Sequence, residues 1–213
     1  MTKVVCVDYG YGNIHSMAKA CQLVAKKLGF QVAVSKNATD IEAASHVILP
    51  GVGAFADCMN GLNALPELKS AIIDAATQDK KPFLGVCVGM QMMAKQGFEH
   101  GVCDGLGWID AQVVKLEPEN ASYKIPHMGW NNLSVKANHA IFDSLSDQDD
   151  VYFVHSYCMK VADADTQYIA AMSNHGGEFP AVVIKDNLIG MQFHPEKSQK
   201  VGLTLLENFL RLG

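Results

Sequence analysis

The stretch Gly85-Val86-Cys87-Val88-Gly89 decides how this sequence of 213 residues is interpreted. The apolar residues before it predict a short buried strand, and Met90 and Gln91 after it predict the start of a helix. Glycines two positions before and after a residue leave room for a tight strand-to-helix corner that holds a nucleophile out of the sheet. Most free cysteines are buried apolar side chains. In this corner we instead predict a nucleophilic Cys87.

The corner also predicts how a reaction intermediate is stabilised. The backbone N–H of Val88, the residue after the cysteine, points toward a developing oxyanion. The N-terminus of the following helix adds positive potential, which favours a thiolate. We therefore include Val88 among the predicted oxyanion-stabilising residues.

A second segment, residues 190–198, reads Gly-Met-Gln-Phe-His-Pro-Glu-Lys-Ser. Residues 188–193 predict a strand with His194 at its end, and Pro195 stops ladder pairing there. Residues i and i+2 of an extended chain lie on the same side, so Glu196 can approach the His194 imidazole. A carboxylate in that place fixes the tautomer of the ring and stabilises the imidazolium. The two segments predict a Cys87–His194–Glu196 arrangement for acyl transfer from a thiol.

The loop Pro50-Gly51-Val52-Gly53 follows another predicted strand, residues 46–49. It can be an ordinary connection, or its glycine-flanked backbone can turn an N–H toward the active site as a second oxyanion donor. Together with the Cys87 corner, the loop favours the second interpretation, which makes Gly51, Val52 and Gly53 candidate oxyanion-hole residues.

The first half of the chain alternates strands and helices. Strands are predicted at residues 4–7, 31–34 and 46–49 and before Cys87, and helices at 14–28 and 62–76. This pattern implies a parallel sheet with helices on both faces and catalytic groups at the carboxyl ends of the strands.

The second half of the chain has a different pattern of predicted elements. Short strands, predicted to add antiparallel pairs beside the parallel core, are expected at residues 112–116, 131–135, 151–157, 168–173, 181–184 and 188–193. A last helix carries Leu203, Leu206 and Leu210 on one face. We predict one α/β domain over residues 1–213, with a three-layer, flavodoxin-like, mostly parallel sheet.

Composition excludes several classes of protein. Hydrophobic residues make up 49% and charged residues 18%, as in an ordinary globular protein, and the net charge of −5 gives no support to nucleic-acid binding. No apolar run reaches membrane-spanning length. The first residues, Met1-Thr2-Lys3, do not lead into a secretory signal, so we expect reduced thiols and a cytoplasmic protein.

Cofactor and metal sites are not expected either. The six cysteines include no C-x-x-C pair, and the eight histidines show no metal-binding spacing. Gly10-x-Gly12 is followed by His15 where a dinucleotide-binding fingerprint needs its third glycine. Asn13 is instead predicted to be the N-cap of the helix at residues 14–28.

These motifs resemble those of a known family. Residues 85–91 and 193–198 are similar to the motifs of triad-type (class I) glutamine amidotransferases. Residues 8–13, 126–131 and 152–157 resemble segments of the glutaminase subunits of imidazole glycerol phosphate synthases. The resemblance covers almost the whole chain.

The resemblance implies that Cys87 attacks the side-chain amide of glutamine with the help of His194, and that Val52 is the residue of the oxyanion strand whose peptide must be correctly oriented. It implies that L-glutamine is held by Gln91 and by the backbone near Ser156 and Tyr157. Glu99 lies outside a clear motif and is a further candidate for holding glutamine.

It also implies a partner, a (β/α)8-barrel cyclase subunit that forms a heterodimer with this chain and receives ammonia through an internal passage. Asn13, Trp130, Tyr152 and Lys197 lie in the segments that meet such a cyclase. Core packing is the alternative role for Trp130 and Tyr152, and ordinary solvation for Lys197.

Two other functions fit the same sequence. The chain can be a paralogous glutaminase that supplies ammonia to another acceptor enzyme, such as one that amidates a surface sugar. It can also be a catalytically idle interaction module, although the presence of all three residues Cys87, His194 and Glu196 argues against that.

Overall fold

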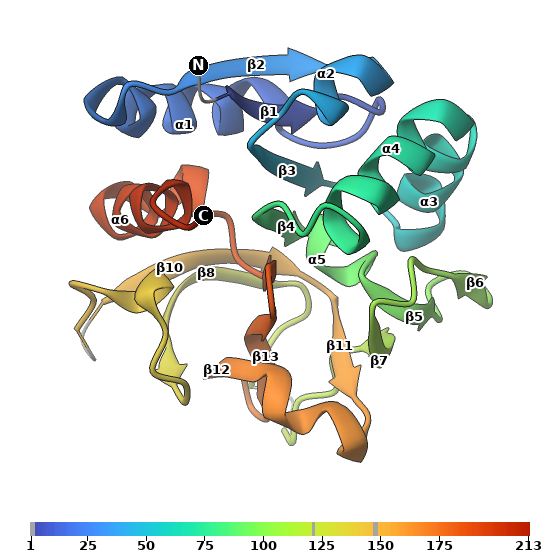
Figure 1. The fold of residues 1–213 in the computed structure, drawn as a ribbon. Helices are drawn as coiled ribbons and strands as arrows, with labels where there is room; N and C mark the ends of the chain where they lie inside the picture. The colour runs from blue at the N-terminus through green and yellow to red at the C-terminus, as the bar shows by residue number, and fades with distance from the viewer. Residues whose placement is uncertain (1–2, 121, 147–148) are drawn as a thin grey trace.

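The computed structural model describes residues 3–120, 122–146 and 149–213. Its largest sheet has eight strands in the order β2-β1-β3-β4-β14-β13-β12-β9 (Figure 1). The bounds are β1 (Lys3–Val7), β2 (Gln31–Ser35), β3 (His46–Gly51), β4 (Phe83–Cys87), β9 (Ser134–Val135), β12 (Ile169–Asn174), β13 (Glu178–Lys185) and β14 (Leu188–Met191).

The first five strands in this order are parallel to one another, and β13, β12 and β9 continue the sheet with antiparallel pairing. The order β2-β1-β3-β4-β14 is that of a flavodoxin-like sheet, so the predicted fold class is confirmed. The grouping of residues 188–193 with the antiparallel strands was wrong in one respect. β14 is antiparallel to β13, but it pairs in parallel with β4, which carries Cys87.

Helices cover both faces of this sheet (Figure 1). On one side α1 (Ile14–Leu28) lies beside α6 (Gln199–Leu210), and on the other lie α2 (Ala38–Glu42), α3 (Phe55–Asn63) and α4 (Pro66–Thr77). Every residue of β3 and β4 is buried between these layers. Met17, Cys21 and Val24 form part of the buried face of α1, as their helical spacing predicts.

The single helix predicted over residues 62–76 was wrong. The structure has two helices there, because α3 ends at Asn63 and α4 begins at Pro66. A proline disfavours helical geometry in the residue before it, and Leu65 accordingly has φ −121° and ψ 69°. Pro66 itself occupies the first turn of α4, where its missing N–H costs nothing.

Two smaller sheets pack against the first. One pairs β10 (Asp150–His155) with β8 (His127–Asn132), and the other has the order β11-β7-β5-β6. Its strands are β5 (Ala94–Gly97), β6 (Cys103–Asp104), β7 (Ile109–Lys115) and β11 (Tyr157–Val161). The 3-10 helices are η1 (Ala140–Phe142), η2 (Asp163–Tyr168) and η3 (Pro195–Lys197).

These sheets correct three sequence predictions. The strand predicted at residues 151–157 is two strands in different sheets, separated at Ser156. The strand predicted at 131–135 is β9 together with the end of β8, which begins at His127. The loop expected near residues 101–107 contains β6.

The sheet places the predicted catalytic segments together at the carboxyl-terminal ends of its parallel strands. In the pairing of β3 with β4, Gly51 lies opposite Cys87. The Pro50 loop and the cysteine corner therefore leave the sheet side by side. β14 lies on the other side of β4 and ends at Met191, three residues before His194. Parallel strands that end together therefore bring the three segments to one place.

Candidate active site

Cys87 is the last residue of β4 and adopts the strained backbone conformation that the corner predicts. Its φ is 54° and its ψ −112°, a backbone conformation that residues other than glycine rarely adopt. A Cβ at Gly89 would lie 1.9 Å from the carbonyl oxygen of Leu49, and one at Gly85 would lie 2.6 Å from that of Gly89. Both glycines are therefore required by close packing of the backbone.

The helix predicted after the corner is present but short. α5 (Val88–Gln91) has four residues, a single turn. Because the helix dipole grows from several aligned peptides, so short a helix adds little of the predicted support for a thiolate.

The candidate oxyanion residues lie directly beside α5. Gly51 is buried, and a Cβ there would lie 2.7 Å from the amide nitrogen of Gly89 and 2.9 Å from Cβ of Val88. Val52 is 44% exposed, and its carbonyl oxygen lies 3.7 Å from the thiol Sγ of Cys58. Gly53 has a φ of +111°, which favours glycine. The backbone of this loop thus borders the corner where an oxyanion would form.

His194 and Glu196 form an ion pair in the turn that leads into α6. Nδ1 of His194 lies 2.9 Å from Oε1 of Glu196, and both side chains are 2% exposed. The segment is held by β10, because the His194 N–H donates to the Tyr152 carbonyl at 2.9 Å. Ser198 Oγ accepts the Tyr152 N–H and donates to the His194 carbonyl, at 2.9 Å and 2.7 Å.

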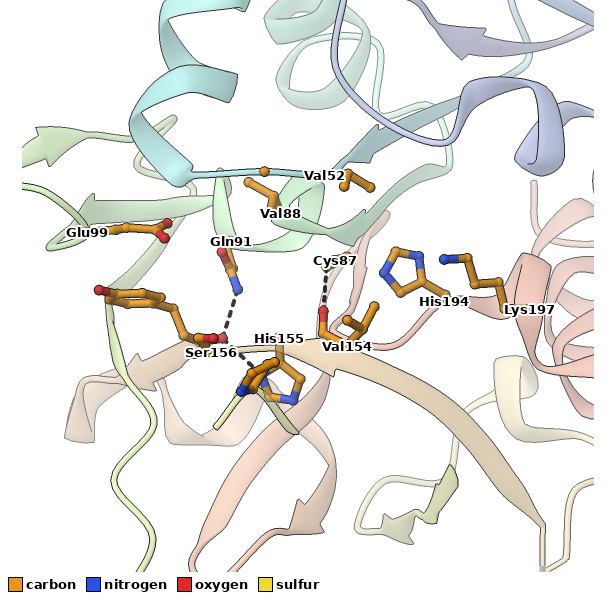
Figure 2. Close-up of a pocket in the computed structure, with 13 residues that line it drawn as sticks. Val52, Cys87, Val88, Gln91, Glu99, Val154, His155, Ser156, His194 and Lys197 are labelled. Atoms are coloured by element: carbon orange, nitrogen blue, oxygen red, sulfur yellow. Dashed lines mark hydrogen bonds between the residues drawn. The ribbon is translucent and has the colours of Figure 1, made fainter. Parts of the chain in front are cut away.

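The environment of His194 favours its protonated form. Burial lowers the pKa of the imidazole, but the neighbouring Cys87 sulfur and the Glu196 carboxylate outweigh burial and raise the pKa to about 9. Figure 2 shows the Cys87 and His194 side chains next to each other. Nε2 of His194 has no hydrogen-bond partner among the described atoms. It is therefore available to a reacting group.

A cavity of about 270 Å³ lies in front of Cys87 and His194 (Figure 2). It is lined by Val52, Gly53, Cys87, Val88, Gln91, Glu99, Pro126, Val154, His155, Ser156, Tyr157, His194 and Lys197. The predicted triad, oxyanion and glutamine-binding residues all line it except Glu196 and Gly51. Of the predicted interface residues, Lys197 lines the cavity, whereas Asn13, Trp130 and Tyr152 do not.

The candidate glutamine-binding residues come from separate parts of the fold. Nε2 of Gln91 donates to the Tyr157 carbonyl at 2.9 Å and lies 3.1 Å from Oε1 of Gln192. Glu99 accepts the Phe55 N–H at 2.9 Å, which caps the start of α3 beside the cavity. Ser156 reaches the cavity because the chain bends there from one sheet to another.

Three of the four predicted interface residues, Trp130, Tyr152 and Lys197, lie near one another at β8 and β10. Trp130 lies opposite Tyr152 in the strand pairing, with the two rings 5.8 Å apart and nearly perpendicular. Nζ of Lys197 lies 5.9 Å from the centre of the Tyr152 ring. Trp130 is 46% exposed and Met128 62%, so this face of β8 presents large apolar side chains to solvent. Asn13 lies elsewhere, at the N-cap of α1, where its side chain makes no capping hydrogen bond.

Sequence reasoning missed several residues of the site, among them His155 and Gln192. Each is a buried polar residue within an apolar strand or just past its end. His155 continues the inward-facing positions of Val151 and Phe153, and Gln192 follows the apolar β14. A polar residue at a position predicted to be buried was the available signal, because it must find a hydrogen-bond partner inside.

His155 belongs to a buried chain of hydrogen bonds. Its Nδ1 donates to the Tyr157 carbonyl at 3.0 Å, so its Nε2 accepts from Nδ1 of His127, also at 3.0 Å. Nε2 of His127 in turn faces the Asn131 amide nitrogen at 3.3 Å. Both imidazoles are therefore neutral. Burial above all lowers the pKa of His155 to about 4 and that of His127 to about 3.

These two histidines predict a loss of stability in mild acid. Below pH 6.5 the two imidazoles bind protons in the unfolded chain but stay neutral in the folded chain. The free energy of unfolding therefore falls as the pH drops from 6.5 toward 4. His155 contributes about 3 kcal/mol of this fall. His155→Asn keeps a donor near the Tyr157 carbonyl but does not titrate, so urea unfolding at pH 7, 6 and 5 is expected to show a weaker pH dependence. The exposed substitution His15→Asn serves as the control, and an unchanged slope in His155→Asn contradicts this account.

Within residues 3–120, 122–146 and 149–213, no group of three or more His, Cys, Asp or Glu side chains is arranged to hold a metal ion. No described helix combines the length and apolar composition needed to cross a membrane. All six cysteines lie in the described part of the chain and are free thiols.

Comparison with known proteins identifies relatives over nearly the full chain. Residues 5–212 match the family model of class-I glutamine amidotransferases. The HisH subunit of imidazole glycerol phosphate synthase from Brucella suis is 44% identical over 214 residues, with 98% of each chain covered. The subunits of the same name from Agrobacterium fabrum and Ruegeria pomeroyi are 43% and 46% identical and cover 98% and 96% of this chain and the same shares of their own.

Solved structures show the same fold at lower identity. A putative GMP synthase protein from Thermoplasma acidophilum superimposes with a TM-score of 0.69 at 21% identity, over 99% of this chain and 92% of that one. A glutamine amidotransferase from Thermotoga maritima has a TM-score of 0.65 at 16% identity, over 92% and 76% of the two chains. At these identities the likeness shows the fold alone.

Proposed function

Because this chain belongs to the class-I glutamine amidotransferase family, we propose that it is the glutaminase subunit of an imidazole glycerol phosphate synthase and acts as one amidotransferase domain over residues 1–213. The relatives of that name match it over at least 96% of both chains. One observation carries the chemistry. Cys87 in its strained corner and His194, which is paired with Glu196, line one cavity.

The reaction is hydrolysis of the glutamine side-chain amide. The Cys87 thiolate attacks the amide carbon, and the His194 imidazolium gives its proton to the departing nitrogen, which leaves as ammonia. Water then adds to the glutamyl thioester and gives a proton to His194, and glutamate and the thiolate are released. Glu196 holds the imidazole in the tautomer that exposes Nε2 to the reaction.

The oxyanion of each tetrahedral intermediate needs backbone donors. We assign this role to the Val88 N–H and to the backbone of Gly51, Val52 and Gly53. In support, Val88, Val52 and Gly53 line the cavity, and Gly51 lies opposite Cys87 in the strand pairing. Loss of one such donor lowers kcat by about 10²–10³. A change in the orientation of the Val52 peptide is therefore sufficient to switch the glutaminase on and off.

L-Glutamine occupies the cavity between Glu99 and Cys87. In Figure 2 Glu99 lies at the opposite end from His194 and Lys197, where its carboxylate attracts the α-ammonium group of the substrate. Gln91 and the backbone of Ser156 and Tyr157 line the same space. No cofactor takes part in this mechanism.

The partner is a (β/α)8-barrel cyclase, which forms a heterodimer with this chain. It docks on the face formed by Trp130, Tyr152 and Lys197, makes a separate contact at Asn13, and takes up the ammonia through an internal passage. The products of the complex are imidazole glycerol phosphate and an aminoimidazole carboxamide ribotide, in histidine biosynthesis. The free thiols fit a cytoplasmic location.

Glutamine hydrolysis measured with and without the cyclase of the same organism and its nucleotide substrate tests this function. We expect the isolated chain to be nearly idle and the complex with nucleotide to release glutamate at least about 10-fold faster, because the Val52 peptide is then correctly oriented. Activation by a different acceptor enzyme and none by the cyclase contradicts the proposal and favours a paralogous glutaminase. No glutamine turnover with any partner favours the idle interaction module.

A further inference from the structure

Gln192 lies against the predicted nucleophile, although the mechanism above gives it no role. Its side chain is completely buried, and its Nε2 lies 3.8 Å from Sγ of Cys87. Its backbone N–H donates to the Ala181 carbonyl at 2.9 Å, which ties the residue to β13. A buried amide must be hydrogen-bonded, and this one uses the reacting sulfur as a partner.

The hydrogen bonds around Gln192 fix which end of its amide faces the sulfur. Its Nε2, an amide donor, is the atom that lies 3.8 Å from Sγ of Cys87, where the sulfur is the acceptor. The Oε1 end then faces Nε2 of Gln91 at 3.1 Å, which is a donor. Gln91 cannot be reversed, because the same Nε2 also donates to the Tyr157 carbonyl at 2.9 Å.

The Tyr157 carbonyl is itself held in place. Nδ1 of His155 donates to it at 3.0 Å, so two donors converge on one carbonyl oxygen. His155 is anchored by His127 on β8. The orientation of the Gln192 amide is thus set by a chain of buried hydrogen bonds and not by a single contact.

We propose, in an inference that rests on the proposed function, that Gln192 is a further catalytic residue. Its side-chain N–H donates to the Cys87 thiolate. It stabilises the charged sulfur before attack and again when the thioester breaks and the thiolate leaves. A hydrogen bond to a charged acceptor is stronger than one to a neutral acceptor, and the sulfur of the thioester carries no charge. α5 is too short to provide this stabilisation.

The test measures the thiolate itself. Alkylation of Cys87 by iodoacetamide, followed by mass spectrometry of the Cys87 peptide, is measured from pH 5 to 9 in the absence of glutamine. Gln192→Glu places a carboxylate oxygen against the sulfur, and Gln192→Met replaces the amide with an apolar group of similar length. Both variants are expected to shift the midpoint of alkylation upward by at least about one pH unit and to lower kcat about 10- to 100-fold.

Gln112→Glu, at an exposed position of β7, makes the same charge change away from the site and is expected to behave like wild type. If a Gln192 variant does not fold, Gln192→Asn keeps the amide but draws it back from the sulfur, and the same upward shift is expected. A purely structural role for Gln192 changes KM or thermal stability and leaves the alkylation midpoint unchanged. An unchanged midpoint in the folded variants overturns this proposal. Glutamine hydrolysis that persists in Cys87→Ala instead overturns the proposed function.

Discussion

Cys87→Ala is expected to abolish glutamine hydrolysis, with a loss of at least about 10⁴-fold in kcat. The sulfur is the atom that forms the bond to the substrate, and no other side chain of the corner can replace it. The fold should survive, because alanine removes one sulfur atom and the strained backbone at φ 54° is held by the packing of Gly85 and Gly89.

The decisive measurement compares two nitrogen sources in the complex with the cyclase. Synthesis from glutamine should be lost in Cys87→Ala, whereas synthesis from added ammonium salts should continue at the wild-type rate. Cys21→Ala, at a buried free cysteine on α1, is the matched control and should keep both activities. Loss of both activities in Cys87→Ala would show that Cys87 is a structural residue.

Glu196→Gln is expected to lower kcat up to about 10⁴-fold without a change of shape. The neutral amide no longer stabilises the imidazolium, and it can bind the tautomer of His194 whose Nδ1 lacks the proton. The pKa of His194, which Cys87 and Glu196 together raise to about 9, should fall. The high-pH limb of the kcat/KM profile should therefore move to lower pH in the variant.

Glu196→Gln should also change how the free energy of unfolding depends on pH. A raised pKa in the folded state stabilises the protein fully below the unfolded value of 6.5, and this stabilisation is lost as the pH rises through about 9. Glu196→Gln should therefore be more destabilising at pH 6 than at pH 9.5 in urea unfolding. Glu178→Gln, at an exposed position of β13, provides the control. Equal destabilisation at both pH values would falsify the assigned coupling between Glu196 and His194.

Much of the fold could be predicted because its signals are local. The alternation of strands and helices before Cys87 predicted a parallel sheet, and the order β2-β1-β3-β4-β14 confirms its flavodoxin-like class. Errors arose where two local signals conflicted or where the structure depended on distant pairing. Pro66 divides the helix predicted over 62–76, although the apolar spacing continues across the break. The parallel pairing of β14 with β4 could not be predicted, because pairing partners are chosen by the whole sheet.

The sequence by itself determined the cysteine corner and the His194–Glu196 pair, since each depends on spacings of one or two residues that backbone geometry fixes. Only the tertiary structure decided which groups surround the sulfur. Gln192 and the Tyr157 carbonyl are 105 and 66 residues from the groups they contact, Cys87 and Gln91. Such contacts form because buried polar groups must pair with whatever donors and acceptors the packed sheets bring near them, and no local pattern records which these are.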